Sequence, residues 1–382
     1  MKALIYVQHL LGIGHLARVS RIAAALAEAG ADVTLASGGA PVAGFPAAAV
    51  RLVQLPPIRS RDASFSELVD AEDRPLSDTF RALRRERLLC VFEAVRPDVL
   101  VVEAFPFGRR QMRFELVPLL ERARAQRHPP IIASSVRDIL QDSRKPGRAE
   151  ETLELVERFF DIVLVHGDPG FARLEETFPL ARRMAERIAY TGLVAGEPQG
   201  TPERFDVVVS AGGGVAGRKL IEAAAAAAPG LMTRWPRWCI ITGPNFPQAE
   251  RSALAGRLPD GVRLETFRPD FPGLLAKAAL SVSQAGYNTV CDLLRARCRA
   301  VLVPFAEGGE TEQSKRAERL ASLGLAVMVR EDGLDPEGLA QAMKAAPDPA
   351  SHRIDLDGAA QTARLLGARL ASREAPAGGL EH

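Results

Sequence analysis

Short apolar runs alternate with helical patterns along this chain, and the alternation limits the fold more than any other feature. In the first half, apolar runs at residues 3–7, 32–36 and 98–102 are separated by stretches with helical periodicity, such as residues 16–29 and 80–95. Strands that alternate with helices form parallel sheets with right-handed crossovers. The sequence therefore predicts an α/β fold.

The same alternation starts again after a linker. Residues 196–204 are rich in glycine, proline and polar side chains, and a new strand at 206–210 is followed by a glycine-rich turn and an alanine-rich helix at 219–228. A chain of 382 residues is also too long for one hydrophobic core, since domains usually contain about 100–200 residues. We therefore predict two Rossmann-like domains, at residues 1–196 and 205–370.

The charge balance and the cysteines disfavour several classes of protein. The formal net charge is +2, so no overall field attracts nucleic acid, and we interpret the Arg-rich stretches 81–87 and 109–113 as solvated helix faces. No apolar run approaches the ~18 residues of a membrane span. We expect a cytoplasmic protein, in which the helices at 80–95 and 117–127 are candidates for peripheral contact with the inner membrane face. The cysteines form no CxxC pair and are expected to be free thiols, not disulfides or zinc ligands: Cys90, Cys239, Cys291 and Cys298.

The first glycine-rich turn follows the first strand. Its Gly12-x-Gly14-x-x-Ala17 spacing formally fits the dinucleotide-binding fingerprint, which would indicate a dehydrogenase. Two features count against that alternative. The second strand ends in Ala36-Ser37-Gly38 without a carboxylate for a ribose hydroxyl, and His15 lies inside the turn, where a pyrophosphate needs bare backbone.

His15 is instead interpreted as a catalytic base. The dipole at a helix N-terminus disfavours imidazolium, so the imidazole stays neutral and able to accept a proton. The flanking glycines, Gly14 among them, would let a substrate approach closely. The alternative is a histidine that only caps the helix.

A second glycine-rich turn follows the strand at 206–210. Gly212, Gly213 and Gly214 would expose backbone amides, and the helix that begins nearby adds partial positive charge, so that together they predict a phosphate cradle. The turn is similar to a Walker A loop but has Arg218-Lys219 where Lys-Ser/Thr is required, so the hydroxyl that binds Mg²⁺ is missing. This substitution disfavours an ATPase, and the remaining alternative is a tight turn without a ligand.

A third turn lies at the strand-to-helix junction around Gly286. Asn288 and Thr289 follow in the first turn of the helix, and Asp292 comes one turn later, where its carboxylate suits the two hydroxyl donors of a ribose. After the next strand, Glu312-Gln313 would open another helix and face the same ligand. The alternative for this pair is an ordinary polar surface.

These three turns together resemble glycosyltransferase family 28, most clearly over residues 206–340. The segment Ser283-Gln284-Ala285-Gly286-Tyr287-Asn288-Thr289 is similar to the family's Ser-Arg-Ala-Gly-x-x-Thr segment. Asp292 falls where the family has its ribose-binding glutamate, and Glu312-Gln313 falls on the pair that contacts the donor sugar. Phe267-Arg268 lies where the family's loop reaches the base of the nucleotide.

The resemblance implies the GT-B fold, with two facing Rossmann-like domains and parallel sheets. It implies a nucleotide sugar, usually a UDP sugar, as a substrate held by the C-terminal domain, with the acceptor on the N-terminal domain and no cofactor. The Gly-x-Gly-His-x-x-Arg form of the first turn is more similar to predicted bacterial glycosyltransferases and to a nucleotide-sugar hydrolase of flagellin-sugar biosynthesis. His15 matches the catalytic histidine position in both, and Arg18 follows one turn later.

Together these features predict an inverting, metal-independent glycosyltransferase. His15 would take a proton from an acceptor hydroxyl as it attacks the anomeric carbon, and the glycine-turn amides, with Arg218, would stabilise the departing diphosphate. A nucleotide-sugar hydrolase or epimerase on the same fold and a non-catalytic binding protein remain alternatives. Weaker candidates for contact with the unidentified acceptor, each with the alternative of a structural role only, are Arg18, Glu103, Arg137 and Asp138.

Overall fold

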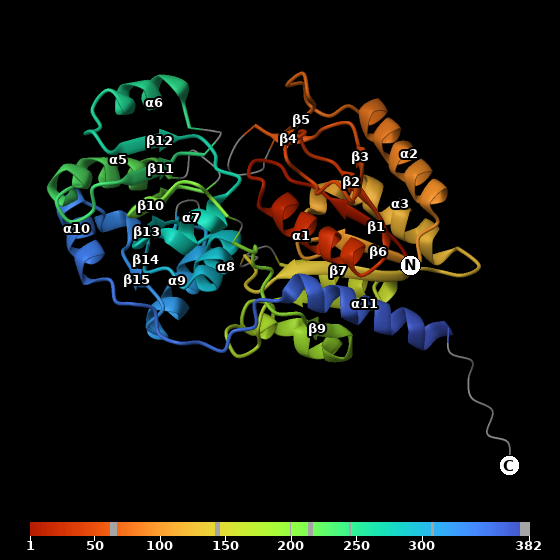
Figure 1. Cartoon of the computed structure of the whole chain (residues 1–382). Coiled ribbons are helices and arrows are strands. Elements are labelled where there is room, and N and C mark those ends of the chain that lie inside the picture. Colours follow the sequence, from red (N-terminus) through yellow and green to blue (C-terminus); the bar gives the residue numbers. More distant parts are fainter. Residues whose placement is uncertain are drawn as a thin grey trace, which may run out of the picture. The chain divides into compact units, whose positions relative to one another are not determined.

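The structure is a computed structural model that describes residues 1–61, 67–141, 146–198, 200–212, 217–243, 246–306 and 309–374. Gly213 and Gly214 of the second glycine turn lie outside the described residues. The chain divides into two compact units: Met1–Val194 together with the segment from Asp357 onward, and Ala195–Leu356. Each unit is built around its own parallel sheet (Figure 1).

Within the described residues, the sheet of the first unit has seven strands in the order β3-β2-β1-β6-β7-β8-β9, and neighbouring strands are parallel. The inner strands are almost entirely buried, as expected for a parallel sheet covered by helices on both faces. Their bounds are β1 Lys2–Val7, β2 Asp32–Ser37, β3 Arg51–Gln54, β6 Val99–Glu103, β7 Ile131–Arg137, β8 Ile162–His166 and β9 Ile188–Tyr190.

The helices of this unit begin and end at identifiable signals. The hydroxyl of Ser77 accepts a hydrogen bond of 3.1 Å from the Phe80 amide and so caps α2, which ends at Arg96 in the left-handed conformation. The bounds are α1 Gly14–Glu28, α2 Asp78–Val95, α3 Arg113–Arg124, α4 Arg148–Phe159 and α11 Gly358–Glu374, with 3₁₀ turns at Arg110–Met112, Leu174–Glu176 and Pro179–Arg187. A small antiparallel pair is formed by β4 Arg59–Ser60 and β5 Leu68–Val69.

The last helix of the chain belongs to the first unit. Helix α11 packs against α1 (Figure 1), and its Thr362 and Leu366 are buried. The division predicted from the sequence places residues up to 370 in the second domain, and the structure differs in this respect. The difference arises because the apolar face of α11 does not reveal in the sequence which sheet it will cover.

The second unit repeats the architecture with six strands in the order β12-β11-β10-β13-β14-β15, all parallel within the described residues. The strands are β10 Val207–Ser210, β11 Trp238–Ile241, β12 Val262–Glu265, β13 Leu280–Ser283, β14 Ala300–Leu302 and β15 Val327–Met328. The helices are α5 Arg218–Ala227, α6 Gln248–Ala255, α7 Phe271–Lys277, α8 Tyr287–Ala296, α9 Glu312–Ser322 and α10 Pro336–Ala345, with 3₁₀ turns at Ala228–Leu231 and Glu331–Gly333.

Each sheet has a point at which the strand order reverses. In the first unit β1 lies between β2 and β6, and in the second unit β10 lies between β11 and β13. Loops that follow the two strands at such a point diverge to opposite faces and leave space at the carboxyl edge of the sheet, where ligands of open α/β sheets bind. The loops after β1 and β6, and those after β10 and β13, are therefore the places to look for function.

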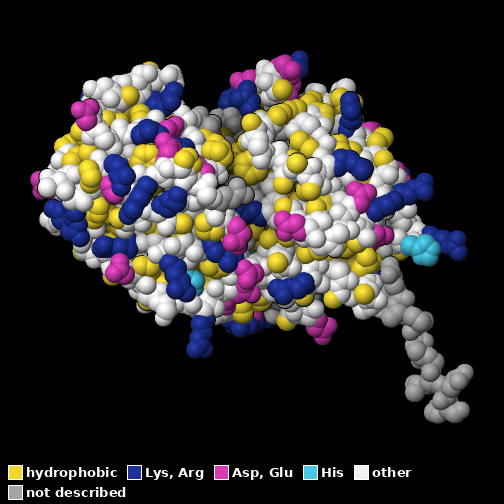
Figure 2. Space-filling model, in the orientation of Figure 1, with side chains coloured by type: hydrophobic (Ala, Val, Ile, Leu, Met, Phe, Trp, Pro, Cys, Tyr) yellow, Lys and Arg dark blue, Asp and Glu magenta, His cyan; other side chains and the backbone are white. Residues whose placement is uncertain are grey.

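The surface carries charges of both signs. On the face shown in Figure 2, Lys and Arg side chains are interspersed with Asp and Glu, in keeping with the small net charge. Cys90 is exposed and the other three cysteines are buried, and all four are free thiols. In the part of the chain that the structure describes, no helix is long and apolar enough to cross a bilayer.

Candidate active site

The predicted base, His15, is paired with a buried carboxylate. His15 lies in the first turn of α1, and its Nδ1 donates to Oε1 of Glu103 at 2.8 Å. Glu103 is the last residue of β6, which pairs with β1 in the sheet, so the strand order brings these side chains together across 88 residues of sequence. The side chain of Glu103 is fully buried, whereas that of His15 remains 18% exposed.

Glu103 is held in its ionised form. Burial raises the pKa of this carboxyl, but the charge of Arg18 and hydrogen bonds from His15 and Ser135 outweigh burial and keep the pKa well below its usual range. Arg18 pairs with Oε1, and the hydroxyl of Ser135 donates to Oε2. An ionised carboxylate can only accept hydrogen bonds, so the proton between His15 and Glu103 lies on Nδ1 of the imidazole.

His15 therefore has the form that a general base needs. Burial and the positive charge of Arg109 lower its pKa to about 3, although Glu103 acts in the opposite direction. With Nδ1 protonated, the lone pair of the neutral ring is on Nε2, and Nε2 has no hydrogen-bond partner among the residues that the structure describes. A substrate hydroxyl at Nε2 could transfer its proton there.

The lowered pKa of His15 predicts a particular pH dependence. A base with a pKa lowered to about 3 stays neutral as the pH falls through the usual histidine range and becomes protonated only near its own pKa. We therefore expect kcat/KM for release of nucleoside diphosphate from a nucleotide sugar to be level between about pH 5 and pH 8 as far as this group is concerned. An acidic limb with an apparent pKa of about 6.5, the unperturbed value of histidine, that is lost in His15→Gln would contradict this expectation.

The structure changes the interpretation of two residues considered for contact with the acceptor. Arg18 and Glu103 are both buried and paired with each other, and both lie next to Nδ1 of His15, so contact of either with an acceptor stays a prediction. Arg137, half-buried at the end of β7, and Asp138, which is buried, also lie at the carboxyl edge of this sheet. Contact of Arg137 or Asp138 with an acceptor stays a prediction.

Arg109 is a charged neighbour of His15 that the sequence interpretation missed. The sequence places it on a solvated face, but it is half-buried, and its Nε donates to the backbone oxygen of Gln8 at 2.8 Å. Burial and the charge of Arg137 lower its pKa to about 10. Its position directly after β6, in the loop that also follows Glu103, was the available signal.

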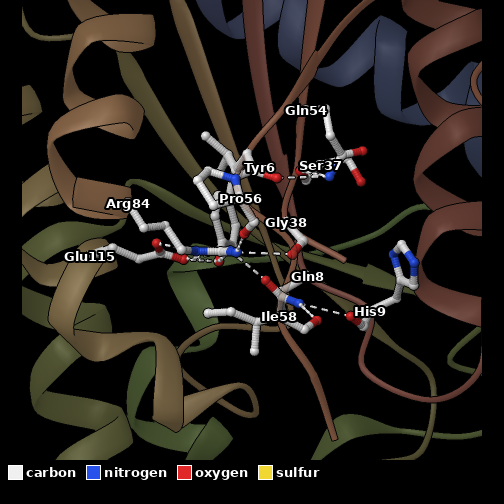
Figure 3. Close-up of polar contacts among 11 residues, drawn as sticks. Tyr6, Gln8, His9, Ser37, Gly38, Gln54, Pro56, Ile58, Arg84 and Glu115 are labelled. Carbon is white, nitrogen blue, oxygen red and sulfur yellow. Dashed lines mark hydrogen bonds and ion pairs between the residues drawn. The ribbon is translucent and has the colours of Figure 1, made fainter. Parts of the chain in front are cut away.

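A second buried charge cluster holds the loops around His15. Arg84 of α2 lies between Glu115 of α3 and Gln8 (Figure 3): its Nε donates to Glu115 Oε2 at 2.6 Å and its Nη2 to Gln8 Oε1 at 2.5 Å. Its Nη1 donates to the backbone oxygens of Gly38, at 2.9 Å, and Pro56. Arg84 thus connects the loops that follow β1, β2 and β3.

Glycine is required where these loops pass the buried groups. A Cβ on Gly38 would collide with the Arg84 guanidinium and with Gln8 Oε1, and a Cβ on Gly39 would collide with the ring of His9.

The hydroxyl of Tyr6 donates to Glu115 at 2.5 Å, and burial and the charge of Glu115 raise the pKa of Tyr6 well above its usual value. The predicted solvated face at 81–87 is therefore wrong for Arg84, which is fully buried.

In the second unit, two predicted glycine corners lie at neighbouring strand ends. Gly212 follows β10 and Gly286 follows β13, and these strands pair as Ser210↔Ser283. Gly212 has φ +66°, a conformation that favours glycine. Apart from its two chain neighbours, no heavy atom of the described residues lies within 4 Å of the Cβ position of Gly286, which precedes the N-terminus of α8. Among the described residues, this corner therefore has space in front of it and a helix dipole behind it, as a phosphate site requires.

Other residues predicted to bind the donor support this corner through their own contacts. Gln313 Oε1 accepts from the amides of Ala285, at 3.1 Å, and Phe305, at 3.2 Å. Glu312 pairs at 2.8 Å with the buried Arg316, whose Nη1 donates to the backbone oxygen of Ala285 at 2.9 Å. These atoms of Glu312 and Gln313 hold the Ala285–Gly286 loop in place, and a direct contact with a sugar stays a prediction.

The remaining donor-side predictions differ in accessibility. Phe267 is 43% exposed and offers an aromatic face, whereas Arg268 is bound by both oxygens of Asp270 at 2.9 and 2.8 Å. Arg218, the first residue of α5, pairs with Glu250 at 2.6 Å on the surface. Asp292 is buried, and its Oδ1 accepts from the amide of Gly196 at 2.9 Å.

Asn288 and Thr289 lie half-buried in the first turn of α8, and Gly14 is the first residue of α1. In the described part of the chain, no group of three or more His, Cys, Asp or Glu side chains is placed to hold a metal ion.

The second unit has a recognisable family profile. The profile of the glycosyltransferase family 28 C-terminal domain matches residues 207–364. Residues 207–364 are a glycosyltransferase family 28 C-terminal domain. The predicted resemblance is thereby confirmed for this segment, which contains every residue predicted to bind the donor except Gly14 of the first unit.

Curated relatives are similar to this chain over a limited length. The UDP-N-acetylglucosamine--N-acetylmuramyl-(pentapeptide) pyrophosphoryl-undecaprenol N-acetylglucosamine transferase of Acidithiobacillus ferrooxidans is 32% identical over 176 residues, which is 41% of this chain and 49% of that protein. The enzyme of the same name from Synechococcus sp. (strain CC9605) is 36% identical over 106 residues, 28% of each chain. The chain thus spans about half or less of the length of these relatives.

Solved structures extend the similarity to the fold of both units. The calicheamicin glycosyltransferase CalG4 is similar with a TM-score of 0.58 and 19% identity over 97% of this chain and 94% of that one. Acinetobacter baumannii MurG gives a TM-score of 0.53 with 17% identity, over 96% and 94% of the chains. Glycosyltransferase VinC in complex with dTDP gives 0.56 with 15% identity, over 97% and 96%. The family 28 domain is therefore part of a GT-B fold, as predicted.

Proposed function

We propose that this chain is an inverting, metal-independent glycosyltransferase that moves a sugar from a nucleotide sugar to a hydroxyl acceptor. The observation that carries the proposal is the state of the His15 imidazole. The ring is neutral, and the buried, ionised Glu103 binds its Nδ1 proton, so the lone pair lies on the exposed side of the ring, at Nε2. The family 28 domain supports a nucleotide-sugar donor, because the curated relatives are named as transferases of N-acetylglucosamine from UDP-N-acetylglucosamine. UDP and dTDP sugars are the first donors to test, the latter because VinC was solved with dTDP.

In this proposal the donor is bound by the second unit. The diphosphate would accept hydrogen bonds from the amides at the Gly286 corner and at the Gly212 turn. The nucleobase would stack on the exposed ring of Phe267. Asp292 would bind the ribose after exchanging its hydrogen bond with Gly196 for one with a ribose hydroxyl. The acceptor would be bound near His15 by the first unit.

The proposed reaction is a single displacement. As the acceptor oxygen forms its bond to the anomeric carbon, its proton passes to Nε2 of His15, and the bond between the anomeric carbon and the diphosphate breaks with its electron pair leaving on the diphosphate oxygen. Attack from the face opposite the leaving group inverts the configuration. Glu103 stabilises the imidazolium that forms, and general-base assistance of this kind contributes about 10²–10⁴-fold to a rate.

The open space at Gly286 gives a test of donor binding. We expect Gly286→Val to weaken the binding of nucleoside diphosphate at least about tenfold, which corresponds to about 1.4 kcal/mol, because the new side chain would occupy the space in front of the amides. Stability should be unchanged, since φ −65° and ψ 147° suit any residue and, apart from the two chain neighbours, no atom of the described part of the chain lies within 4 Å of the Cβ position.

Gly230→Val is the matched control for this prediction. Gly230 also has no atom within 4 Å of its Cβ position, but it follows the far end of α5, away from the carboxyl edge of the sheet. Titration calorimetry with UDP, dTDP and GDP measures both variants. Equal affinities of wild type and Gly286→Val would contradict a diphosphate at this corner.

Incubation with a panel of nucleotide sugars tests the function itself. Slow release of nucleoside diphosphate without acceptor, accelerated by an acceptor alcohol, is expected of a transferase. Rapid stoichiometric release of free sugar with water alone would instead establish the second candidate, a nucleotide-sugar hydrolase, which the Gly-x-Gly-His-x-x-Arg form of the first turn also fits. Absence of turnover with every donor would contradict both.

A further inference from the structure

A buried series of hydrogen bonds runs from Glu103 on β6 across β7 and β8 to the loop after the edge strand β9. The Ser135 hydroxyl, which donates to Glu103, lies 2.8 Å from Nε2 of His166. On the other side of the His166 ring, Nδ1 lies 2.9 Å from the hydroxyl oxygen of Thr191. Ser135, His166 and Thr191 have no exposed surface. Glu103, Ser135 and His166 come from the adjacent strands β6, β7 and β8, and Thr191 follows β9.

The direction of each hydrogen bond follows from counting protons. Glu103 is ionised and has no proton to give, so the single proton of Ser135 goes to Glu103. The oxygen of Ser135 must then accept from His166, which places a proton on Nε2 of that ring. Burial, and then the charge of Arg18, lower the pKa of His166 to about 3, so the ring is neutral and its Nδ1 has a lone pair.

Thr191 completes the assignment. Its hydroxyl lies 2.9 Å both from Nδ1 of His166 and from the backbone oxygen of Gly192, and it has one proton. If that proton went to Gly192, two lone pairs would face each other between Thr191 and the neutral ring of His166. The proton of Thr191 therefore goes to Nδ1, and all donors in the chain point toward Glu103.

We infer that Ser135 and His166 are positioning residues for His15. By donating in series toward Oε2, they keep Glu103 ionised and turned so that Oε1 accepts from Nδ1 of His15, which leaves the lone pair of His15 on Nε2. In metal sites, partners that orient a histidine through its second nitrogen commonly contribute about 10–100-fold to affinity or activity, and we expect an effect of similar size here. The catalytic meaning of this inference rests on the proposed function, but the state of the ring can be measured without any substrate.

The test is a ¹⁵N-histidine NMR spectrum of the full chain at neutral pH, compared between wild type and single-residue variants. Wild type should show a His15 ring with a protonated Nδ1, whose proton exchanges slowly with water, and an unprotonated Nε2. Ser135→Ala and His166→Leu interrupt the series, and each should accelerate exchange of the Nδ1 proton at least about tenfold or abolish its resonance. His166→Gln retains an N–H donor at the end of a side chain of similar reach and should restore the wild-type signal.

His352→Gln is the matched control, because His352 lies in the other unit and is also partly buried. It should leave the His15 resonances unchanged. An unchanged exchange rate of the Nδ1 proton in folded Ser135→Ala would overturn the inference, and so would equal loss of the resonance in His166→Leu and His166→Gln. A wild type that shows the expected His15 signature but turns over no nucleotide sugar would contradict the proposed function and leave this inference standing.

Discussion

Replacement of His15 by alanine is expected to lower the rate of nucleoside diphosphate release at least about 100-fold, because the variant has no group to take the proton of the attacking hydroxyl. Burial and the charge of Arg109 keep His15 neutral, and Glu103 fixes its proton on Nδ1. The lone pair that accepts the proton of the attacking hydroxyl is therefore on Nε2. Binding of the nucleoside diphosphate should change little, since the donor is assigned to the second unit.

Steady-state kinetics and calorimetry on the same preparation separate these two effects. His128→Ala provides the control, because His128 is an exposed histidine of the same unit. Unchanged turnover in His15→Ala would show that His15 is not the base. Loss of nucleotide affinity in parallel with the rate would show that His15 contributes to donor binding instead.

Replacement of Arg84 by methionine is expected to destabilise the first unit by about 3–5 kcal/mol, since it removes one partner of a fully buried ion pair and leaves the other uncompensated. Arg84 and Glu115 are both fully buried, and the guanidinium also binds the backbone oxygens of Gly38 and Pro56. Urea unfolding followed by circular dichroism measures the free energy of unfolding. Arg81→Met is the matched control, because Arg81 lies on the same helix in an exposed ion pair with Asp78. This variant should change the free energy of unfolding very little.

A double variant tests whether the stability lost in Arg84→Met is due to the carboxylate of Glu115, which is left without its partner. Arg84→Met combined with Glu115→Leu removes both charges, and buried pairs replaced by apolar side chains are often close to neutral in stability. We expect the double variant to recover part of the lost stability, because the Pro56 oxygen still lacks the Arg84 donor and the Gly38 oxygen keeps only its hydrogen bond from the Ile58 amide. A free energy of unfolding for Arg84→Met within about 1 kcal/mol of wild type would contradict the role given to this cluster.

Much of the fold follows from periodicity in the sequence. The apolar runs at 3–7 and 98–102 become β1 and β6, and the helix at 80–95 becomes α2 with Ser77 as its cap. Strands of this kind are buried by helices on both faces, so their hydrophobic pattern is local and readable. The return of α11 to the first unit was not predicted, because it depends on which apolar surface is left uncovered after the rest of the chain has folded.

The sequence predicts which residues lie near the candidate site, but not which side chains contact one another there. His15, Gly286 and Asp292 were identified from their places after glycine turns and strand ends. The contact of His15 with Glu103 depends on β1 and β6 being neighbours in the sheet, which is a property of strand order and not of local sequence. For the same reason the sequence predicts a surface position for Arg84, although its partners Glu115, Gly38, Pro56 and Gln8 all come from distant parts of the chain.

The central claim is that peptide amides at the glycine corners of the family 28 domain bind a diphosphate. Calorimetric titration of the wild type with UDP, dTDP and GDP, each compared with its nucleoside, tests it most directly. We expect at least one diphosphate to bind about 100-fold or more tightly than its nucleoside, a difference of about 2.7 kcal/mol. Equal affinities for diphosphate and nucleoside in all three pairs, or no binding of any diphosphate, would contradict it.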